Sequence, residues 1–190
     1  MKKLAGAFIL IGFIFLGVGG YQYLSTVREG NETLREANAL LAQPIEPIQD
    51  KGFIFKPEKG ETVGLLNIDK IDAAIPIIEG TDPDELRRGV GHLAQTAYPG
   101  ENDQILFSGH RDTVFTRLGE IEVGDIISVE LPHGTFDYEM VDSKIVSADD
   151  TTVIGSTAPD EELVVTTCYP FGYIGHAPDR YVIYAVPVEE

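Results

Sequence analysis

The sequence predicts a mainly β domain, either a closed barrel or a sandwich, that follows an N-terminal membrane helix. After residue 61, short apolar runs alternate with Gly, Pro and Asp, which is the pattern of many short strands. Residues 4–24, by contrast, contain no charged side chain. The chain has 190 residues, of which 43% are hydrophobic, so it can form one domain with a real core, and an intrinsically disordered acidic protein is disfavoured.

The N-terminal apolar segment is long enough to span a bilayer. Its 21 residues, at about 1.5 Å each in a helix, reach roughly 30 Å, the thickness of the hydrocarbon core. Lys2 and Lys3 precede it, so the positive-inside rule predicts a cytoplasmic N-terminus and an extracellular remainder. The run passes into Tyr21-Gln22-Tyr23 without a small-x-small cleavage site. An uncleaved single-pass anchor over 1–24 is therefore favoured over a cleaved signal peptide.

The segment 25–61 is predicted to be an extracellular stalk. Asn31 can cap a short helix that Pro44 ends, and Pro47 and Pro57 keep the next stretch extended. One side of this helix is apolar and carries Leu34, Ala37, Leu40 and Leu41. A solvated spacer is the favoured interpretation, and packing on the domain or on a neighbouring stalk is the alternative.

The segment 62–190 is predicted to be the folded domain. Its candidate strands are Val63–Asp69, Ala74–Ile78, Gln104–Ser108, Asp125–Leu131, Thr135–Val141, Lys144–Ser147, Glu162–Cys168 and Arg180–Val186. A hairpin turn is expected at 131–135 and one short capped helix at 82–89.

Charge and cysteine content exclude several classes of function. The formal net charge of −17 disfavours nucleic acid and anionic lipid as charge-driven partners, since binding to phosphates depends on Lys and Arg. A single Cys excludes an intramolecular disulfide and any multi-cysteine metal site. The acids at 149, 150, 160, 161 and 162 lack EF-hand spacing, so a solvated loop is favoured over a calcium site and no cofactor is predicted.

The lone cysteine, Cys168, is the candidate nucleophile. It ends the apolar run 163–167 and is followed by Tyr169-Pro170, so it lies where a strand leaves its sheet. A small buried hydrophobic residue is the competing interpretation. An unpaired thiol on an outward-facing domain is an oxidation liability, which favours a reactive role.

A reactive thiol needs an imidazole partner, and four histidines are available. His110 follows the run 105–109, and His176 lies eight residues after the cysteine, so the residues alone leave these two equally placed. His92 is interpreted as a satisfied loop residue and His133 as a solvated residue at the hairpin tip.

An attacking thiolate also creates an oxyanion that needs a donor or a positive charge. Arg180 opens the final strand, and the loop before it can bring its guanidinium beside the thiol. An ion pair with Asp179 is the alternative, and Arg111 beside Asp112 has the same ambiguity. Ser108 is a weaker nucleophile candidate because it lacks the Gly-x-Ser-x-Gly pattern.

Three motifs together resemble the sortases, the cysteine transpeptidases that attach proteins to the cell wall of Gram-positive bacteria. They are Ser108-Gly109-His110-Arg111-Asp112-Thr113, Val164-Val165-Thr166-Thr167-Cys168 and Arg180-Tyr181-Val182-Ile183-Tyr184. The family pattern before the nucleophile is Thr-Leu-x-Thr-Cys; this chain keeps Thr167-Cys168 and has Val164-Val165 at the first two positions. The segment 169–180 is most similar to class D sortases.

The resemblance implies an eight-stranded β-barrel with Cys168 as nucleophile, His110 as general acid/base, and Arg180 as the group that binds the substrate backbone or the oxyanion. It selects His110 over His176. The implied partners are secreted proteins with a C-terminal Leu-Pro-x-Thr-Ala or Leu-Pro-x-Thr-Gly sorting signal, cleaved after Thr, and a peptidoglycan amine that accepts the thioacyl group. Ala at the last position is the preference that class D implies.

Three alternatives remain at this point. A pilus-building sortase commonly has a C-terminal membrane segment and an aromatic lid, and neither is evident before Glu190. A non-catalytic anchored barrel that binds a protein partner predicts an unreactive thiol. A cysteine peptidase shares the nucleophile but releases its product to water.

Overall fold

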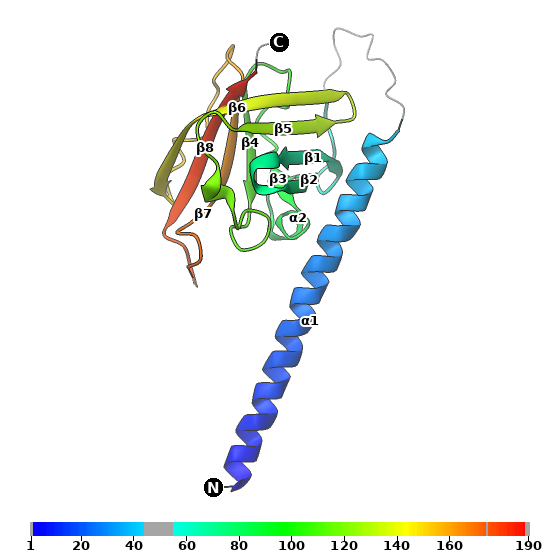
Figure 1. Cartoon of the computed structure of the whole chain (residues 1–190), viewed down its shortest axis with the longest axis vertical. Coiled ribbons are helices and arrows are strands. Elements are labelled where there is room, and N and C mark those ends of the chain that lie inside the picture. Colours follow the sequence, from blue (N-terminus) through cyan, green and yellow to red (C-terminus); the bar gives the residue numbers. More distant parts are fainter. Residues whose placement is uncertain (1, 44–54, 174, 189–190) are drawn as a thin grey trace.

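The computed structural model describes residues 2–43, 55–173 and 175–188, which form a closed β-barrel and one long helix (Figure 1). The strands are β1 Thr62–Ile68, β2 Ala73–Glu79, β3 Val90–His92, β4 Gln104–Gly109, β5 Ile126–Leu131, β6 Gly134–Ser147, β7 Glu162–Tyr169 and β8 Asp179–Pro187. The helices are α1 Lys2–Leu41 and α2 Pro83–Leu86, and short 3-10 turns lie at Asp69–Ile71 and Leu118–Glu120. The predicted mainly β barrel is confirmed.

The order of strands around the barrel is β1-β2-β3-β4-β7-β8-β6-β5. The pairs β2–β3 and β4–β7 are parallel, and the remaining pairs are antiparallel. Ile105 and Phe107 of β4 and Leu163 and Val165 of β7 are fully buried in the core. Because β4 and β7 run in parallel, their carboxyl ends emerge at the same edge of the barrel.

Two strands differ from the prediction. The three-residue strand β3 was not expected, and its Gly91 is required because an added Cβ atom would lie 2.3 Å from the carbonyl oxygen of Gly80. β6 is one long strand where two were predicted. A register shift between Met140 and Asp142 against β8 lets the strand bend and continue.

Helix α1 also differs from the prediction, because no separate stalk helix begins at Asn31. The helix that contains the apolar segment continues without a break to Leu41. A second helix would need its own nucleation step and would leave its first backbone N–H groups without helical partners. Continuing the existing helix avoids both of these costs. The predicted stop at Pro44 and the extended stretch at Pro47 lie outside the described residues.

The last part of α1 packs against the barrel, so the predicted solvated spacer is wrong. Ala37 and Thr33 are buried there. The guanidinium of Arg88 donates to the carbonyl oxygen of Gly60 at 2.7 Å and to Thr62 Oγ1 at 3.0 Å. Thr62 Oγ1 in turn donates to Glu36 Oε2 at 2.8 Å. A polar network therefore joins α1 to β1 and to the segment after α2.

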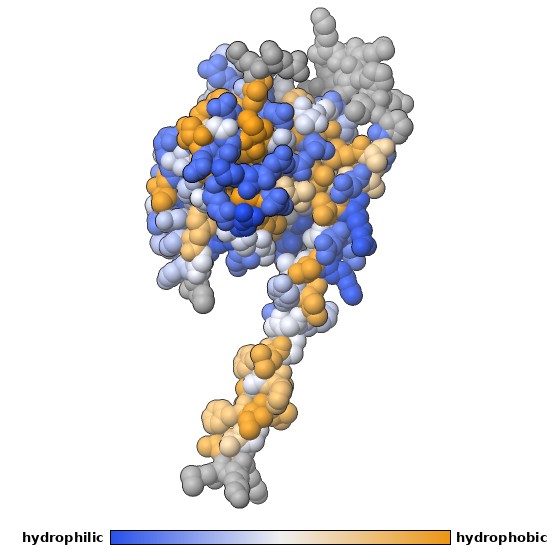
Figure 2. All heavy atoms as spheres, viewed as in Figure 1, coloured by the Kyte–Doolittle hydropathy of each residue, from blue (hydrophilic) through white to orange (hydrophobic). Residues whose placement is uncertain are grey.

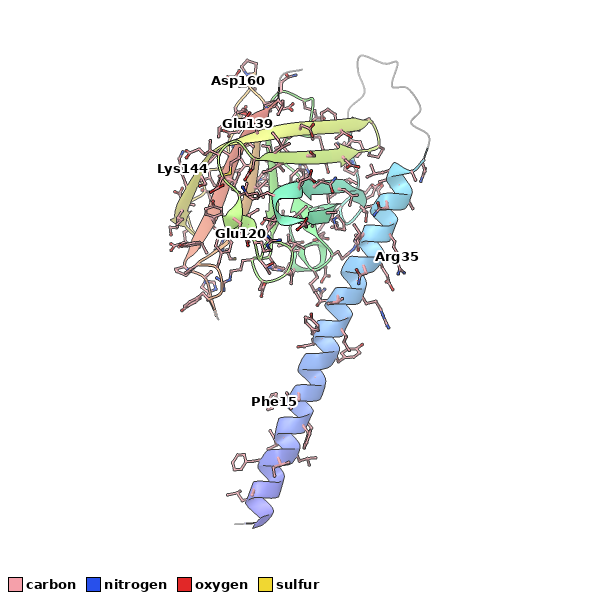
Figure 3. The ribbon with its side chains drawn as sticks, viewed as in Figure 1. Phe15, Arg35, Glu120, Glu139, Lys144 and Asp160 are labelled. Atoms are coloured by element: carbon pink, nitrogen blue, oxygen red, sulfur yellow. The ribbon has the colours of Figure 1, made fainter. Side chains whose placement is uncertain are left out.

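The first part of α1 stands clear of the barrel. Its apolar side chains, Phe15 among them, are exposed along the helix (Figure 3). They form the orange surface of the rod in Figure 2, while much of the visible barrel surface is hydrophilic. By length and composition, this helix is suited to crossing a membrane.

Candidate active site

Cys168 and Arg180 face each other across two antiparallel strands. The register of β7 against β8 pairs Cys168 directly with Arg180. Directly opposed residues project from the same face of a sheet, with Cβ atoms about 4.5–5.5 Å apart. Both residues are half-buried. Because the register pairs them, the β7–β8 connection brings Arg180 back beside Cys168, as predicted.

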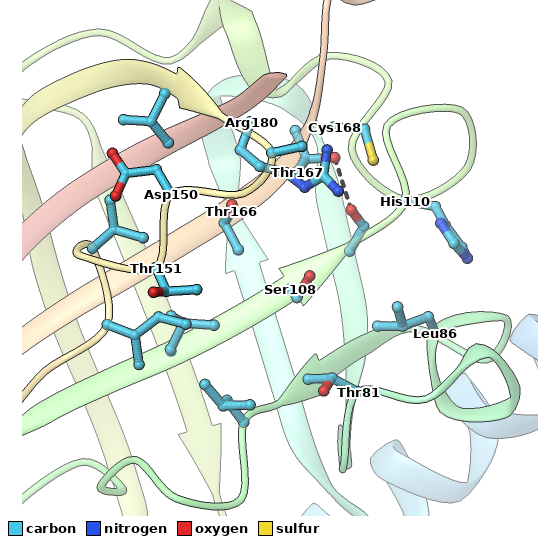
Figure 4. Close-up of a pocket in the computed structure, with 17 residues that line it drawn as sticks. Thr81, Leu86, Ser108, His110, Asp150, Thr151, Thr166, Thr167, Cys168 and Arg180 are labelled. Atoms are coloured by element: carbon cyan, nitrogen blue, oxygen red, sulfur yellow. Dashed lines mark hydrogen bonds between the residues drawn. The ribbon is translucent and has the colours of Figure 1, made fainter. Parts of the chain in front are cut away.

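His110 reaches the same edge through the parallel pair β4–β7. The register pairs Ser108 with Thr166 and Gly109 with Thr167, so His110 and Cys168 are the next residues along their two chains. Thr167 Oγ1 donates to the Gly109 carbonyl oxygen at 2.7 Å, a buried hydrogen bond drawn as a dashed line in Figure 4. This bond fixes the two chains together one residue before the imidazole and the thiol.

Gly109 leaves room for the side chains of the turn that follows His110. A Cβ atom at this position would lie 2.5 Å from the ring of Phe115 and 2.8 Å from Val114. Phe115 is fully buried, and its backbone N–H donates to the His110 carbonyl oxygen at 3.0 Å. The turn after His110 is thus closed by a backbone bond and anchored in the core.

His110, Cys168 and Arg180 line one pocket of about 330 Å³ and lie at one end of it (Figure 4). Its apolar wall comes from strands, from the end of α2 and from the β6–β7 loop, and contains Leu86, Leu93, Leu106, Val146, Val153 and Ile154. Its polar lining contains Thr81, Ser108, Asp150, Thr151 and Thr166. The pocket therefore combines an apolar groove with a thiol, an imidazole and a guanidinium.

The β6–β7 loop, residues 148–161, forms one wall and is held by Asp103, directly before β4, and by Gln104, the first residue of β4. Asp103 Oδ1 accepts hydrogen bonds from the backbone N–H groups of Gln104, Thr157 and Ala158. These donors, with the Gln104 and Thr157 N–H groups the strongest, lower the pKa of the Asp103 carboxyl below its ordinary value. Gln104 is buried; its amide donates to the Val153 carbonyl oxygen and accepts from the Gly155 N–H.

Arg180 forms a different bond from the predicted alternative. Its Nη1 donates to the backbone carbonyl oxygen of Asp179 at 2.9 Å, and the carboxylate of that residue is not the acceptor. A guanidinium carries five N–H donors in a rigid fork. The group therefore combines a fixed orientation with the capacity to donate to a bound carbonyl or oxyanion.

The other histidines are not in this pocket. His176 is exposed in the β7–β8 loop and is not among the pocket-lining residues described. His92 is satisfied as expected but lies buried in β3, where its Nδ1 is 2.7 Å from Glu79 Oε2. His133 is half-buried and not fully solvated as predicted: it packs against Phe55 and Phe136, and burial lowers its pKa.

The described residues contain no group of three or more His, Cys, Asp and Glu side chains that could hold a metal ion. Two acids near the β6–β7 loop have partners within the protein. Asp150 accepts from the N–H and hydroxyl of Thr152. Glu161 accepts from the Gly100 and Asn102 N–H groups.

Sequence reasoning missed the residues that support this site. The side chains of Gln104 and Arg111 donate to backbone carbonyls 49 to 64 residues away in the chain, and such partners leave no local pattern. The one available signal was the position of Asp103-Gln104 directly before a buried apolar run, which marks a strand start with polar side chains free to bond elsewhere.

Comparisons with known proteins agree with this geometry. The Sortase domain family matches residues 66–188. The chain is 47% identical over 193 residues to Sortase D of Bacillus subtilis (strain 168), covering 97% of this chain and 98% of that relative. The solved Clostridium perfringens Sortase D5 transpeptidase has a TM-score of 0.72 and 28% identity, covering 85% of this chain and 99% of its own.

A further solved structure shares the fold. Clostridium perfringens sortase C, solved with the C-terminal cell wall sorting motif, has a TM-score of 0.64 at 23% identity and covers 86% of this chain and 90% of its own. Family, near full-length relative and barrel architecture all agree. The chain belongs to the sortase family and is a cysteine transpeptidase.

Proposed function

We propose that this protein cleaves a Leu-Pro-x-Thr-Ala or Leu-Pro-x-Thr-Gly sorting signal after Thr and transfers the secreted protein to a peptidoglycan amine. Cys168 is the nucleophile, His110 the general acid/base and Arg180 the oxyanion or backbone donor. The observation that carries the proposal is the strand register. It opposes Cys168 to Arg180 and sets His110 one residue beyond the last β4–β7 pair.

In the first half-reaction the Cys168 thiolate attacks the Thr carbonyl carbon of the signal. The carbonyl oxygen becomes an oxyanion, to which Arg180 donates. The C–N bond then breaks as His110 gives its proton to the leaving amine, and a thioester remains on Cys168. The C-terminal fragment of the signal departs with a free amino group.

In the second half-reaction an amine of a peptidoglycan precursor attacks the thioester. His110 accepts the proton of the amine, the C–S bond breaks, and Cys168 returns to its starting state. The thioester conserves enough of the energy of the peptide bond for this transfer to proceed without ATP.

The apolar wall supports a signal that begins with Leu-Pro. Leu86, Leu93 and Val153 offer a surface that has no charge to satisfy and can bury two apolar side chains. Ala at the last position is the preference we expect, because the chain resembles class D sortases.

The membrane assignment is part of the same proposal. The first part of α1 spans the bilayer with the N-terminus in the cytoplasm, and the barrel lies outside. Substrates that emerge from the same membrane then share a plane with the enzyme, which raises their effective concentration.

The test uses the full-length chain reconstituted in lipid nanodiscs. It is incubated with Leu-Pro-x-Thr-Ala and Leu-Pro-x-Thr-Gly peptides, with and without a peptidoglycan stem-peptide amine, and protein and products are weighed by mass spectrometry. The expected result is an acyl adduct on Cys168 that moves to the amine. The Cys168→Ala variant serves as the control and should carry no adduct.

Two results would contradict the proposal. An adduct that only water resolves, at the same rate with and without amine, would make the enzyme a peptidase. A folded protein whose thiol is never acylated by either peptide would remove the sorting-signal assignment.

A further inference from the structure

The β7–β8 loop, of which residues 170–173 and 175–178 are described, is a part of the site that strand pairing does not fix. It begins two residues after Cys168 and ends immediately before β8, in which Arg180 lies. Gly172 and Gly175 have φ values of 69° and 117°, so the loop turns twice through the left-handed region. Both nucleophile and guanidinium are therefore attached to a loop whose conformation depends on side-chain contacts.

Arg111 makes three hydrogen bonds to the backbone of this loop. Its Nη1 donates to the Pro170 carbonyl oxygen at 3.1 Å, and its Nη2 donates to those of Tyr173 at 2.7 Å and Gly175 at 2.9 Å. The guanidinium carbon also lies 5.7 Å from the centre of the Tyr173 ring. The alternative of an ion pair with Asp112 is replaced by a clamp on the loop.

The clamp joins the two chains that carry the reacting groups. Arg111 is covalently next to His110, and Pro170 is two residues after Cys168. A guanidinium bonded to the Pro170 carbonyl thus closes a small ring of chain that contains both the imidazole and the thiol. Movement of the loop away from Arg111 would change the separation of His110 from Cys168.

We propose that Arg111 is a positioning residue that holds His110 and Cys168 at reacting distance by fixing the β7–β8 loop. The inference rests on the proposed function, because it assigns those two residues to proton transfer and attack. Proton transfer and attack depend steeply on distance, and a misplacement of about 1 Å can cost on the order of 10²-fold in rate.

The base of the loop has a second anchor that does not involve Arg111. The Phe171 ring packs edge-on against Tyr169 and against Tyr181 of β8, with ring centres 5.6 and 5.4 Å apart. It also covers Gly119, where an added Cβ atom would lie 2.7 Å from the ring. Loss of the arginine should therefore release the loop without unfolding the barrel.

The geometry distinguishes arginine from lysine at this position. Three carbonyl groups from three residues are reached by two nitrogen atoms of one planar fork. A lysine ammonium is a single point and cannot occupy both positions. Arg111→Lys should therefore keep the charge and lose the clamp.

The experiment compares Arg111→Ala, Arg111→Lys and the control Arg117→Ala in the full-length chain in nanodiscs. Arg117 lies in the same connection between β4 and β5 and also donates to a backbone carbonyl, that of Ile71 at 2.9 Å. Among the described residues its other hydrogen-bond and ion-pair partners are Glu120 and Asp72, outside the β7–β8 loop. Acyl transfer to an amine gives kcat and KM, and hydrogen–deuterium exchange reports opening of residues 169–179.

For Arg111→Ala we expect kcat to fall about 10- to 100-fold with KM changed less than threefold, because the reacting groups and not the peptide groove are displaced. Arg111→Lys should recover little of the rate. Exchange in the loop should rise at least about tenfold in both variants, as expected for local opening. Arg117→Ala should match the unchanged protein in both measurements.

Three results would overturn the inference. These are an unchanged kcat in Arg111→Ala, a raised KM with unchanged kcat, which would assign Arg111 to substrate binding, and loop exchange equal to that of Arg117→Ala. If the unchanged protein transfers no peptide, the proposed function fails on that result alone, and equal loop exchange would still separately refute the clamp.

Discussion

The hydroxyl of Thr167 donates to the carbonyl oxygen of Gly109 across the parallel strands β7 and β4, 2.7 Å away and out of contact with solvent. This hydrogen bond joins the last paired residues of β4 and β7, directly before His110 and Cys168. Sheet hydrogen bonds alone leave this edge open, because β4 ends at Gly109 while β7 continues.

Thr167→Val should therefore weaken both the fold and the reaction. Valine keeps the shape and leaves the buried Gly109 carbonyl without that donor, at a cost of about 1–3 kcal/mol in the free energy of unfolding. We expect a lower midpoint of chemical denaturation and a kcat for acyl transfer reduced several-fold. Thr167→Ser, which restores the hydroxyl, should recover most of both; a valine variant with unchanged kcat would show that this bond does not position the site.

The histidine assignment gives a direct comparison. His110→Ala should reduce acyl transfer by about 10²- to 10⁴-fold, the usual contribution of a general acid/base. His176→Ala, at an exposed position in the β7–β8 loop, should stay within a few-fold of the unchanged protein. Single-turnover acylation of Cys168 measured by mass spectrometry separates the two. A larger loss in His176→Ala would replace His110 in the mechanism.

The order of the β6–β7 loop should depend on pH through the carboxylate of Asp103. Its pKa is lowered in the folded protein, so the charged form is favoured by folding and its contribution is present above the ordinary value of 3.8. The contribution is lost as pH falls from that value through the lowered pKa of the folded protein, where the carboxylate is protonated. After correction for the intrinsic pH dependence of amide exchange, the protection of loop amides 153–158 should then fall in acid, and Asp103→Asn should show reduced protection already at neutral pH. Asp160→Asn, an exposed carboxylate in the same loop, is the control; equal behaviour of the two variants would contradict the assignment.

Removal of divalent cations should leave the reaction unchanged. Glu161 near this loop is occupied by the Gly100 and Asn102 N–H groups and by the Tyr138 hydroxyl, which donates at 2.7 Å. Asp103 and Gln104 order the loop from within the protein. We expect equal kcat and KM for peptide transfer with a chelator and with added calcium. A KM that falls several-fold on addition of calcium would mean that a cation orders the wall.

How far the sequence predicts this molecule depends on the range of the interactions. Alternating apolar runs located most of the barrel strands, because each run needs only its own residues to form one buried face. β3 was missed because three residues carry too little pattern, and its pairing depends on the close approach of Gly91 to the backbone of Gly80.

The site divides in the same way. Cys168 could be placed from the sequence because it ends an apolar run, and Arg180 because the connection between the two strands is short enough to bring it back beside the thiol. The residues alone left His110 and His176 equally placed, and only the family resemblance favoured His110. The parallel β4–β7 register that brings His110 beside Cys168 joins residues 58 apart and leaves no local signal. Arg111 was out of reach for a similar reason, since its acceptors are backbone carbonyls, which every residue possesses.

Because the last part of α1 packs against the barrel, releasing it should change kcat/KM differently for soluble and for membrane-bound substrates. Leu86 of α2 lines the pocket, and Arg88, two residues later, donates to Thr33 Oγ1 and pairs with Glu36 of α1. Thr33 lies nine residues after Leu24 in the helix, a rise of about 14 Å at 1.5 Å per residue. A docked helix thus sets the height of the pocket above the end of the apolar segment.

Arg88→Ala combined with Ala37→Asp should release the barrel from α1, because a buried position receives a charge and the polar network loses its donor. We expect unchanged kcat/KM for a soluble signal peptide and a several-fold loss for the same signal on a membrane-spanning substrate in the same vesicles. Arg87→Ala is the control, since Arg87 pairs with Asp84 within its own short helical segment. Equal loss on both substrates would place the effect in the active site itself, and no loss on either would show that a fixed height is not required.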